Sequence, residues 1–461
     1  MQKFTELFNR GFKYLVAATL IIVPLYPKFP FLRIPGTYVS IRFEDFLLVI
    51  TAIFTFTVIL PNIKKIFEDN VTRAMTLFLL VGLVSLFSGI LLTQTVISSI
   101  GALHFLRRVE YFVPFFAVFT FFPYERSKNL EFYIKVLMLT VFVAFLYGMG
   151  QKYLRFPVIV TQDSESAKGI ALRWVPGSQL TSTFAGHYDL AAFMVLVLPI
   201  FVSLVFTVKG KLSKVLLVLT SFSGYWLLVN TASRISLVSY LLGTCIALFL
   251  IKKYKAIIVV VIVSLVLSGF SMSLIGRYKS LIDVYLQKVK NMKIVAKPFN
   301  FEISAQEITT TNKIEIATPT PMPVPVVEDR STSIRFNVEW PRAIRAFVKD
   351  PLIGTGYSSI GLAADNDYLR LLAEIGILGF LAFALIIVRI LLVFISEIPL
   401  REKMSGVRLG FTVGVIGGIF GTLLNATFID VFEASKFAIT FWLLVALAMY
   451  TVKDMSYEHK N

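Results

Sequence analysis

Long runs of apolar residues alternate along the chain with short polar segments. A helix that crosses the hydrocarbon core of a bilayer needs about 20 mostly apolar residues. The pattern predicts twelve such helices, which lie at 13–30, 44–60, 75–92, 102–122, 130–150, 187–207, 213–229, 235–251, 255–273, 369–395, 407–425 and 435–452. We therefore expect an all-α integral membrane protein. Since no small-residue cleavage site follows the first run, we expect that run to remain as a membrane anchor.

The composition agrees with the hydropathy pattern. Apolar residues make up 56% of the chain and charged residues 16%, whereas soluble domains carry about 25% charged residues. The single cysteine, Cys245, has no second cysteine with which to form an internal disulfide. With three histidines besides, a His/Cys metal cluster is not favoured, and we expect neither a metal nor another cofactor.

The distribution of basic residues predicts the orientation of the helices. With the N-terminus inside, the inner segments carry 19 Lys and Arg and the short outer segments carry 9. Cytoplasmic loops retain basic residues, so this bias favours a cytoplasmic membrane protein with both termini in the cytoplasm. The same rule accounts for most of the net charge of +17 without invoking nucleic acid as a partner.

A long connection between the ninth and tenth predicted helices lies outside in this topology. The expected organisation is 1–273 with helices one to nine, 274–368 as an extracytoplasmic loop, and 369–461 with helices ten to twelve. Within the loop, 277–293 and 331–350 have the amphipathic pattern of helices that rest on a membrane surface. Between them, the alternating prolines of 318–325 predict an extended linker.

Several ionisable residues lie at the predicted outer ends of the helices, although charges near a membrane are costly and often mark function. Topology places them all at one face. They are Arg173, His187, Arg234, Arg335, Asp365, Asp367, Arg370 and Glu374, and the polar Asn366 lies among them. The bundle can therefore bring residues that are distant in sequence into one pocket.

Each of these residues also has a purely structural interpretation. Arg234 can extend to the lipid headgroups, and His187 can be a hydrogen-bonded interfacial residue. Arg370 and Glu374 have i,i+4 spacing and can pair only with each other. Asp365 can cap the helix that follows it.

Three further patterns have simple structural explanations. Arg107, Arg108 and Glu110 interrupt a predicted span and indicate an internal ion pair. Residues 354–356 (Gly-Thr-Gly) lack the strand context of a phosphate-binding loop and indicate a turn. Residues 365–367 spell Asp-Asn-Asp, which elsewhere holds a metal beside a nucleotide sugar, but such donors are scarce outside the cell.

The charged residues match the needs of one particular reaction. A glycan carried on a lipid diphosphate has an anionic, stable leaving group, which arginine binds with permanently charged donors in a fixed geometry. The acceptor hydroxyl needs a base on the opposite face of the sugar. Arg173, Arg234 and Arg335 can hold the diphosphate, and Asp365, with an ordinary pKa of about 3.9, can accept the proton.

Three segments resemble the O-antigen ligase and O-antigen polymerase family. They are Arg173 with 183–191, then 231–234, and finally 351–356 followed by 365–379. The resemblance is clearest from about 173 to 395 and rests on the order of these segments around the long outer loop.

This resemblance implies a metal-independent, inverting membrane glycosyltransferase with a GT-C-like fold. Its donor would be an undecaprenyl diphosphate-linked glycan at the outer face of the membrane, and its acceptor a glycan, a lipid or a protein. The residues that match Arg234 and Arg335 are thought to contact the diphosphate in that family. The family usually has His-Asn where this chain has Asp365-Asn366, so either the base has changed type or the chemistry has changed.

Two other functional classes stay open. Twelve spans with both ends inside suit a transporter, such as a flippase of lipid-linked sugars, although no repeat relates the two halves of the chain. A binding homologue without activity is the other alternative. Within the glycosyltransferase class, ligation and polymerisation are not distinguished.

Overall fold

A computed structural model describes residues 2–27, 31–33, 40–125, 129–159, 171–269, 333–361 and 363–458. A helix occupies each of the twelve segments in which the hydropathy pattern predicts one. These helices are α1 (Gln2–Leu25), α2 (Phe43–Ile59), α4 (Asn70–Phe87), α5 (Ser98–Glu125), α6 (Leu130–Tyr153), α7 (His187–Thr207), α8 (Lys211–Asn230), α9 (Arg234–Leu250), α10 (Tyr254–Ser268), α14 (Asp367–Ile395), α16 (Gly406–Asn425) and α17 (Ser435–Glu458).

The remaining elements are short and connect these helices. They are α3 (Lys64–Glu68), α13 (Trp340–Lys349), α15 (Leu400–Lys403), the 3-10 turns η1 (Leu60–Asn62) and η6 (Val431–Glu433), the π-helical turns η2 (Ser88–Leu92) and η5 (Arg335–Glu339), and the strands β1 (Leu32–Arg33), β2 (Ser40–Ile41), β3 (Pro157–Ile159) and β4 (Ala171–Arg173). The strands form two antiparallel pairs, β1–β2 and β3–β4. Together η5 and α13 supply the second predicted surface helix, whereas 277–293 and 318–325 lie outside the described residues.

Seven of the helices are long and apolar enough to cross a membrane, by length and composition, within the described residues. The seven are α4 with η2, α6, α7, α8, α14, α16 and α17. Three shorter apolar helices, Gly11–Leu25, α9 and α10, add to them. The protein is therefore an all-α, multi-pass membrane protein, and twelve crossings stay a prediction.

The centre of the bundle is formed by α7, α16 and α17. Along its apolar window α17 is completely buried inside the protein, and α7 is 83% buried. Small residues allow the helices to approach closely, as is common in membrane bundles. A Cβ atom added to Gly417 of α16 would lie 2.2 Å from the carbonyl oxygen of Gly243 in α9, so a larger residue would push the two helices apart.

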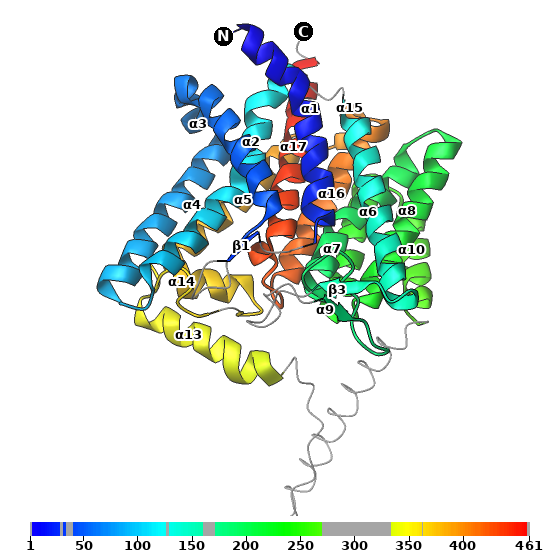
Figure 1. Cartoon of the computed structure of the whole chain (residues 1–461). Helices are drawn as coiled ribbons and strands as arrows, with labels where there is room; N and C mark the ends of the chain where they lie inside the picture. The colour runs from blue at the N-terminus through cyan, green and yellow to red at the C-terminus, as the bar shows by residue number, and fades with distance from the viewer. Residues whose placement is uncertain are drawn as a thin grey trace, which may run out of the picture.

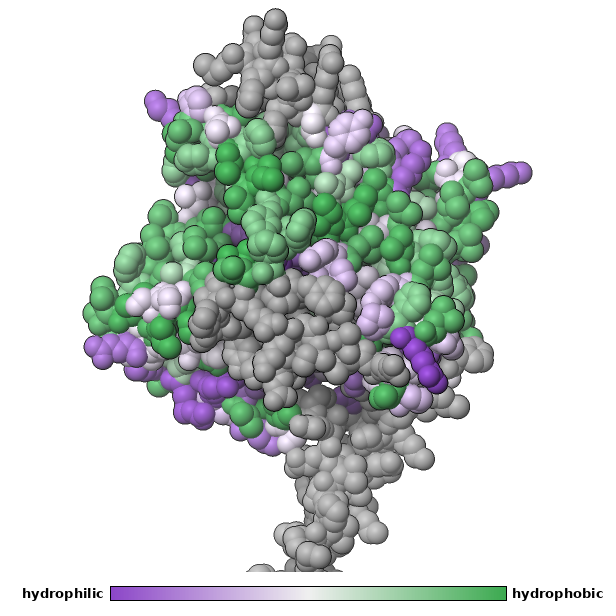
Figure 2. Space-filling model, in the orientation of Figure 1, coloured by the Kyte–Doolittle hydropathy of each residue, from purple (hydrophilic) through white to green (hydrophobic). Residues whose placement is uncertain are grey.

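The flank of the bundle is apolar, as a lipid-facing surface must be. Exposed side chains on it include Phe56, Leu80, Val84, Val259 and Val266. Figure 2 shows hydrophobic residues over much of this side, with hydrophilic residues gathered along the lower edge. The two termini lie together at the opposite end from α13 (Figure 1), which agrees with an even number of crossings.

Helix α14 contains a break that the neighbouring loop repairs. Gly376 interrupts the helix with φ of +68°, and Gly354 in the facing loop has φ of +76°. The loop supplies the backbone hydrogen bonds that the helix loses at the break. These bonds join Thr355 N to Ala373 O (3.0 Å), Gly356 N to Glu374 O (2.8 Å), Ile377 N to Pro351 O (2.9 Å) and Leu378 N to Leu352 O (3.2 Å). Residues 354–356 thus form a structural turn.

Candidate functional site

Arg335 and Asp365 form an ion pair at the end of the bundle that carries α13. Arg335 Nε donates to Asp365 Oδ2 over 2.9 Å, and Arg335 Nη2 donates to the Tyr188 hydroxyl over 3.2 Å. The guanidinium also lies over the Tyr188 ring, 5.5 Å from its centroid. Arg335 is buried and Asp365 is partly exposed. Three segments that are distant in the chain therefore converge on one cation.

The loop before α14 presents Asp365 to Arg335. Asn366 is the N-cap of α14, because its side-chain oxygen accepts from the Leu369 N–H over 3.0 Å. The alternative in which Asp365 caps this helix is therefore wrong. Asp365 itself has a φ of +47°, a left-handed conformation that Asp tolerates better than most residues. Its side chain is thus left to the ion pair.

Asp430, in the loop between α16 and α17, holds the Asp365 segment in place. Its Oδ2 accepts from the N–H groups of Ala364 (2.7 Å) and Asp365 (3.1 Å), and its Oδ1 accepts from that of Asn366 (2.9 Å). Burial opposes ionisation of Asp430, but the Arg370 guanidinium and these N–H groups hold its pKa below the usual value. An ionised Asp430 therefore fixes the backbone on which Asp365 stands.

Arg370 is the centre of a second, buried network. Its Nη1 contacts Glu374 Oε1 at 3.1 Å, as the i,i+4 spacing predicts. Its Nη2 contacts Asp430 Oδ2 at 2.9 Å, and its Nε lies 3.6 Å from Glu433 Oε1. The prediction of an Arg370–Glu374 pair is confirmed, but the interpretation that they pair only with each other is wrong.

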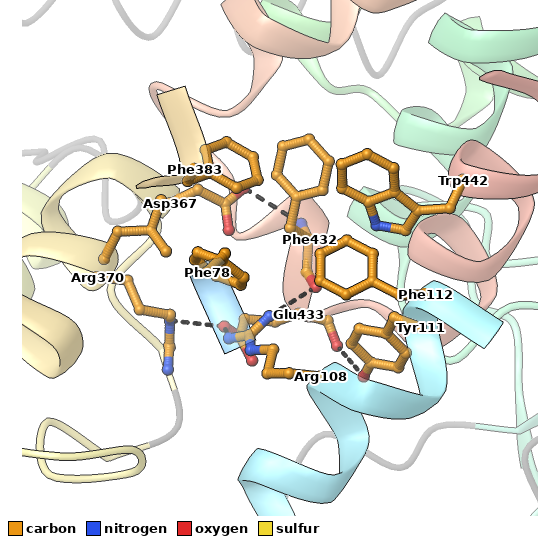
Figure 3. Close-up of a pocket in the computed structure, with 11 residues that line it drawn as sticks. Phe78, Arg108, Tyr111, Phe112, Asp367, Arg370, Phe383, Phe432, Glu433 and Trp442 are labelled. Atoms are coloured by element: carbon orange, nitrogen blue, oxygen red, sulfur yellow. Dashed lines mark hydrogen bonds and ion pairs between the residues drawn. The ribbon is translucent and has the colours of Figure 1, made fainter. Parts of the chain in front are cut away.

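The network continues beneath the site into α5. Arg108 contacts Glu433 and donates to the Phe432 carbonyl over 2.9 Å, while Asp367 accepts from the Phe432 N–H at 3.2 Å (Figure 3). Asp367 also accepts from the Val431 N–H at 2.7 Å. Arg108, Asp367, Phe432 and Glu433 line a cavity of about 30 Å³, which is large enough to hold water. The carboxylates of the Asp-Asn-Asp motif thus have separate partners, Asp367 here and Asp365 on Arg335.

The predicted ion pair inside α5 is present. Arg107 Nη1 lies 3.0 Å from Glu110 Oε2 and 2.8 Å from Asp45 Oδ1 of α2. Arg108 instead forms an ion pair with Glu433, so the two adjacent arginines pair with different acidic residues.

The structure brings Arg234 to the same end of the bundle. Arg234 is the first residue of α9. Two residues further, Ser236 donates to Asn425 Oδ1 over 2.9 Å, and the next carbonyl, that of Ala426, accepts the Asp367 N–H over 3.0 Å. The turn that carries Arg234 and the turn that carries Asp365 are therefore both attached to the end of α16.

The other two predicted residues have less direct relations to Arg335. The ring of His187, the first residue of α7, lies against that of Tyr188 with centroids 4.0 Å apart. His187 thus precedes Tyr188 in the chain and packs against the ring of this tyrosine, which binds Arg335. Arg173 ends β4, in register with Pro157, and its side chain is outside what the structure describes.

Burial shapes the electrostatics around the ion pair. Burial, together with the Asp430 carboxylate, raises the pKa of Asp365, although Arg335 acts in the opposite direction. Burial lowers the pKa of the Arg335 guanidinium, but Tyr188 and Asp365 outweigh it and the net shift is upward. Arg335 is therefore permanently charged, and Asp365 is a stronger base than an exposed aspartate.

Three residues of the site are not predicted from the sequence. They are Tyr188, Asp430 and Glu433. Tyr188 lies within the family-like segment 183–191, but only its contact with Arg335 reveals a role. Asp430 and Glu433 are acids in the short turn between α16 and α17. Arg234 is predicted as a site residue because it is a charged residue in a short outer turn. The same reasoning, applied to acidic residues, predicts Asp430 and Glu433.

Comparison with known proteins gives a family for the part of the chain that holds most of this site. A search of curated proteins finds no match. Residues 215–384 match the family model described as O-Antigen ligase. The matched range includes Arg234, Arg335, Asp365, Arg370 and Glu374, while Tyr188, Asp430 and Glu433 lie outside it. Over residues 215–384, the chain is therefore similar to the O-antigen ligase family.

Proposed function

We propose that the protein is a glycosyltransferase of the outer face of the cytoplasmic membrane. It moves a glycan from an undecaprenyl diphosphate-type lipid to a hydroxyl group of a glycan, a lipid or a protein. The observation that carries the proposal is the buried Arg335 bound to Asp365 at one end of the bundle, within the O-antigen ligase segment. Both termini lie at the opposite, cytoplasmic end in this proposal.

The arginines bind the leaving group. Arg335 uses Nε and Nη2 for Asp365 and Tyr188, and its Nη1 provides further donors for a phosphate oxygen. Arg234 lies at the start of α9, attached to the same end of α16, and Arg173 supplies the third cation. Permanently charged donors in a fixed geometry stabilise the negative charge that the diphosphate gains as it departs.

Asp365 accepts the proton. The acceptor hydroxyl oxygen attacks the anomeric carbon of the donor sugar, and the bond from that carbon to the diphosphate oxygen breaks. The lipid diphosphate leaves with the bonding electron pair, and the hydroxyl proton passes to the Asp365 carboxylate. Arg335 engages Oδ2 of this carboxylate, and Oδ1 accepts the proton. An attack from the face opposite the leaving group inverts the configuration of the sugar.

The buried network positions this base. The Asp430 carboxylate accepts three backbone N–H groups of residues 364–366, and together with the Asn366 cap it fixes the backbone on both sides of Asp365. A base held within a small range of positions loses little entropy in the transition state. Asp430, Asn366, Asp367, Arg370 and Glu374 are therefore positioning residues, and His187 supports Tyr188.

The test uses purified protein in vesicles and the lipid-linked glycan that accumulates in cells lacking the protein. A transferase releases free lipid diphosphate when an acceptor fraction from the same cells is present. The variants Arg335→Ala and Asp365→Asn should not release it. A flippase moves the glycan across the vesicle membrane without releasing lipid diphosphate, and a binding protein does neither. Either of the last two results refutes the proposal.

A further inference from the structure

Glu339 is an acid beside the site that has no role in the proposed reaction so far. It ends the π-helical turn η5, which begins with Arg335. Side chains four residues apart on a helix lie on the same side, and single π-helical turns are frequent at functional sites. Glu339 thus stands one turn from the arginine that is proposed to hold the diphosphate.

One carboxyl oxygen of Glu339 lacks a partner. Its Oε2 is buried and has no hydrogen bond within the described part of the chain. A buried carboxylate oxygen without a donor is costly when it is charged. The neutral acid, or a ligand that supplies a hydrogen-bonding group, relieves this cost.

The surroundings of Glu339 favour the neutral acid. Burial comes first, and the carboxylates of Asp365 and Asp430 add to it, while Arg335 and Arg342 act in the opposite direction. Together they raise the pKa of Glu339 to about 7. Asp365, in contrast, has Arg335 in direct contact.

We propose that Glu339 is the general acid of the transfer reaction and protonates the departing diphosphate, an inference that rests on the proposed function. As the bond from the anomeric carbon to the diphosphate oxygen breaks, the Glu339 carboxyl donates its proton to that oxygen. In the same step Asp365 takes the proton of the acceptor hydroxyl. Asp365 gains one proton and Glu339 loses one, so the total charge of the two carboxyl groups does not change. Proton exchange with water then returns Asp365 to its ionised form and Glu339 to its protonated form.

Two carboxyls with different environments commonly divide the roles of acid and base. Here Asp365 has its cation at 2.9 Å, which favours the ionised base. Glu339 has an unpartnered oxygen and two acids nearby, which favours the protonated acid. Glu339 follows Arg335 by one turn, and Arg335 is the residue proposed to bind the diphosphate, so the acid stands near the group that it would protonate.

The first experiment measures the pH dependence of lipid diphosphate release from the accumulated lipid-linked glycan. The wild-type rate should fall as pH rises through about 7, because Glu339 then loses its proton. Glu339→Gln should lower turnover on the order of 10²-fold and remove this alkaline limb, and Glu339→Asp should restore part of both. The control Asn337→Ala changes an exposed residue of the same turn, which bonds only to Ser333 in the described structure, and should behave as wild type.

A second measurement does not depend on turnover. The infrared difference spectrum between the wild type and Glu339→Gln in vesicles should show a protonated carboxyl band of the wild type at about pH 6. A difference spectrum without this band, or a variant with wild-type rate and an intact alkaline limb, overturns the assignment. An inactive wild-type protein refutes the proposed function instead, so the two failures are distinguishable.

Discussion

Arg370 and Asp430 approach to 2.9 Å, although 60 residues separate them in the chain. The pair connects the first turn of α14 to the loop that precedes α17. The same carboxylate accepts the N–H groups of Ala364 and Asp365. The position of the proposed base therefore depends on a residue from the last loop of the bundle.

The first prediction concerns Asp430. Asp430→Asn removes the charge opposite the buried Arg370 and turns an amide toward N–H groups that need an acceptor. Breaking a buried ion pair costs about 3 to 5 kcal/mol, so the denaturation temperature in detergent and the activity should fall together. Glu397→Gln is the control, since its partner Lys403 lies in an exposed pair at 2.8 Å, and such pairs contribute about 1 kcal/mol or less. A variant as stable as the wild type would contradict the role of Asp430.

The second prediction concerns Asp365. Asp365→Asn keeps the size of the side chain but removes the proton acceptor, so turnover should fall about 10² to 10⁴-fold with donor binding kept. Asp365→His should recover part of the activity. That activity should be lost as pH falls through about 6.5, because only neutral histidine accepts a proton. Normal turnover of Asp365→Asn would remove Asp365 from the mechanism.

The third prediction concerns Arg234, the first residue of α9. Arg234→Lys keeps the charge but loses the two-pronged geometry, so the rate of lipid diphosphate release should fall at least about tenfold, or 1.4 kcal/mol of barrier. Arg234→Ala should be slower still. Lys209→Ala, at the opposite end of the bundle, is the control for a change of charge. If Arg234→Ala is normally abundant and fully active, Arg234 only extends to the lipid headgroups.

The fourth prediction concerns Gly376. A Cβ atom at this position would lie 2.3 Å from the Leu352 carbonyl oxygen, and a left-handed backbone costs a non-glycine residue about 1 to 3 kcal/mol. Gly376→Ala should therefore lower the denaturation temperature and the yield of folded protein. Gly11→Ala is the matched control, since in the described part of the chain its added Cβ meets no side chain and no other segment within 4 Å. Equal behaviour of the two variants would mean that the break in α14 is not required.

The fifth prediction concerns topology. In a Cys245→Ser background, Val348→Cys, at an exposed position of α13, should react with an impermeant maleimide in intact cells. Lys209→Cys, in the connection between α7 and α8, should react only after the cells are opened. The reverse pattern would place the site in the cytoplasm and exclude an extracytoplasmic lipid-linked donor.

The hydropathy pattern was sufficient to locate the helices because each bilayer span must satisfy its own backbone hydrogen bonds. The pattern gave the approximate limits of α7, α9 and α14 without any knowledge of their neighbours. It also placed Arg335 and Asp365 at one face, and the structure pairs them.

Contacts between segments that are distant in the chain could not be predicted from the sequence. Asp430 acts through backbone N–H groups 64 to 66 residues away, and no periodicity within one helix encodes such a contact. From the sequence, Asp365 is a plausible N-cap of α14, since Asp caps helices about as well as Asn. Only the conformation of the loop shows that Asn366 has this role and that Asp365 is left to Arg335.

The break at Gly376 divides α14 into two consecutive pieces that lie in different surroundings. One is surrounded by protein loops, and the other has the length of a membrane span. The piece from Ile377 to Ile395 has 19 residues, and at about 1.5 Å per residue it is roughly 28 Å long, close to the thickness of the hydrocarbon core. The membrane can therefore be crossed without the piece from Asp367 to Ile375. Arg370 and Glu374 stand on that first piece, packed against loops, so the chain can place charges on a membrane helix without exposing them to lipid.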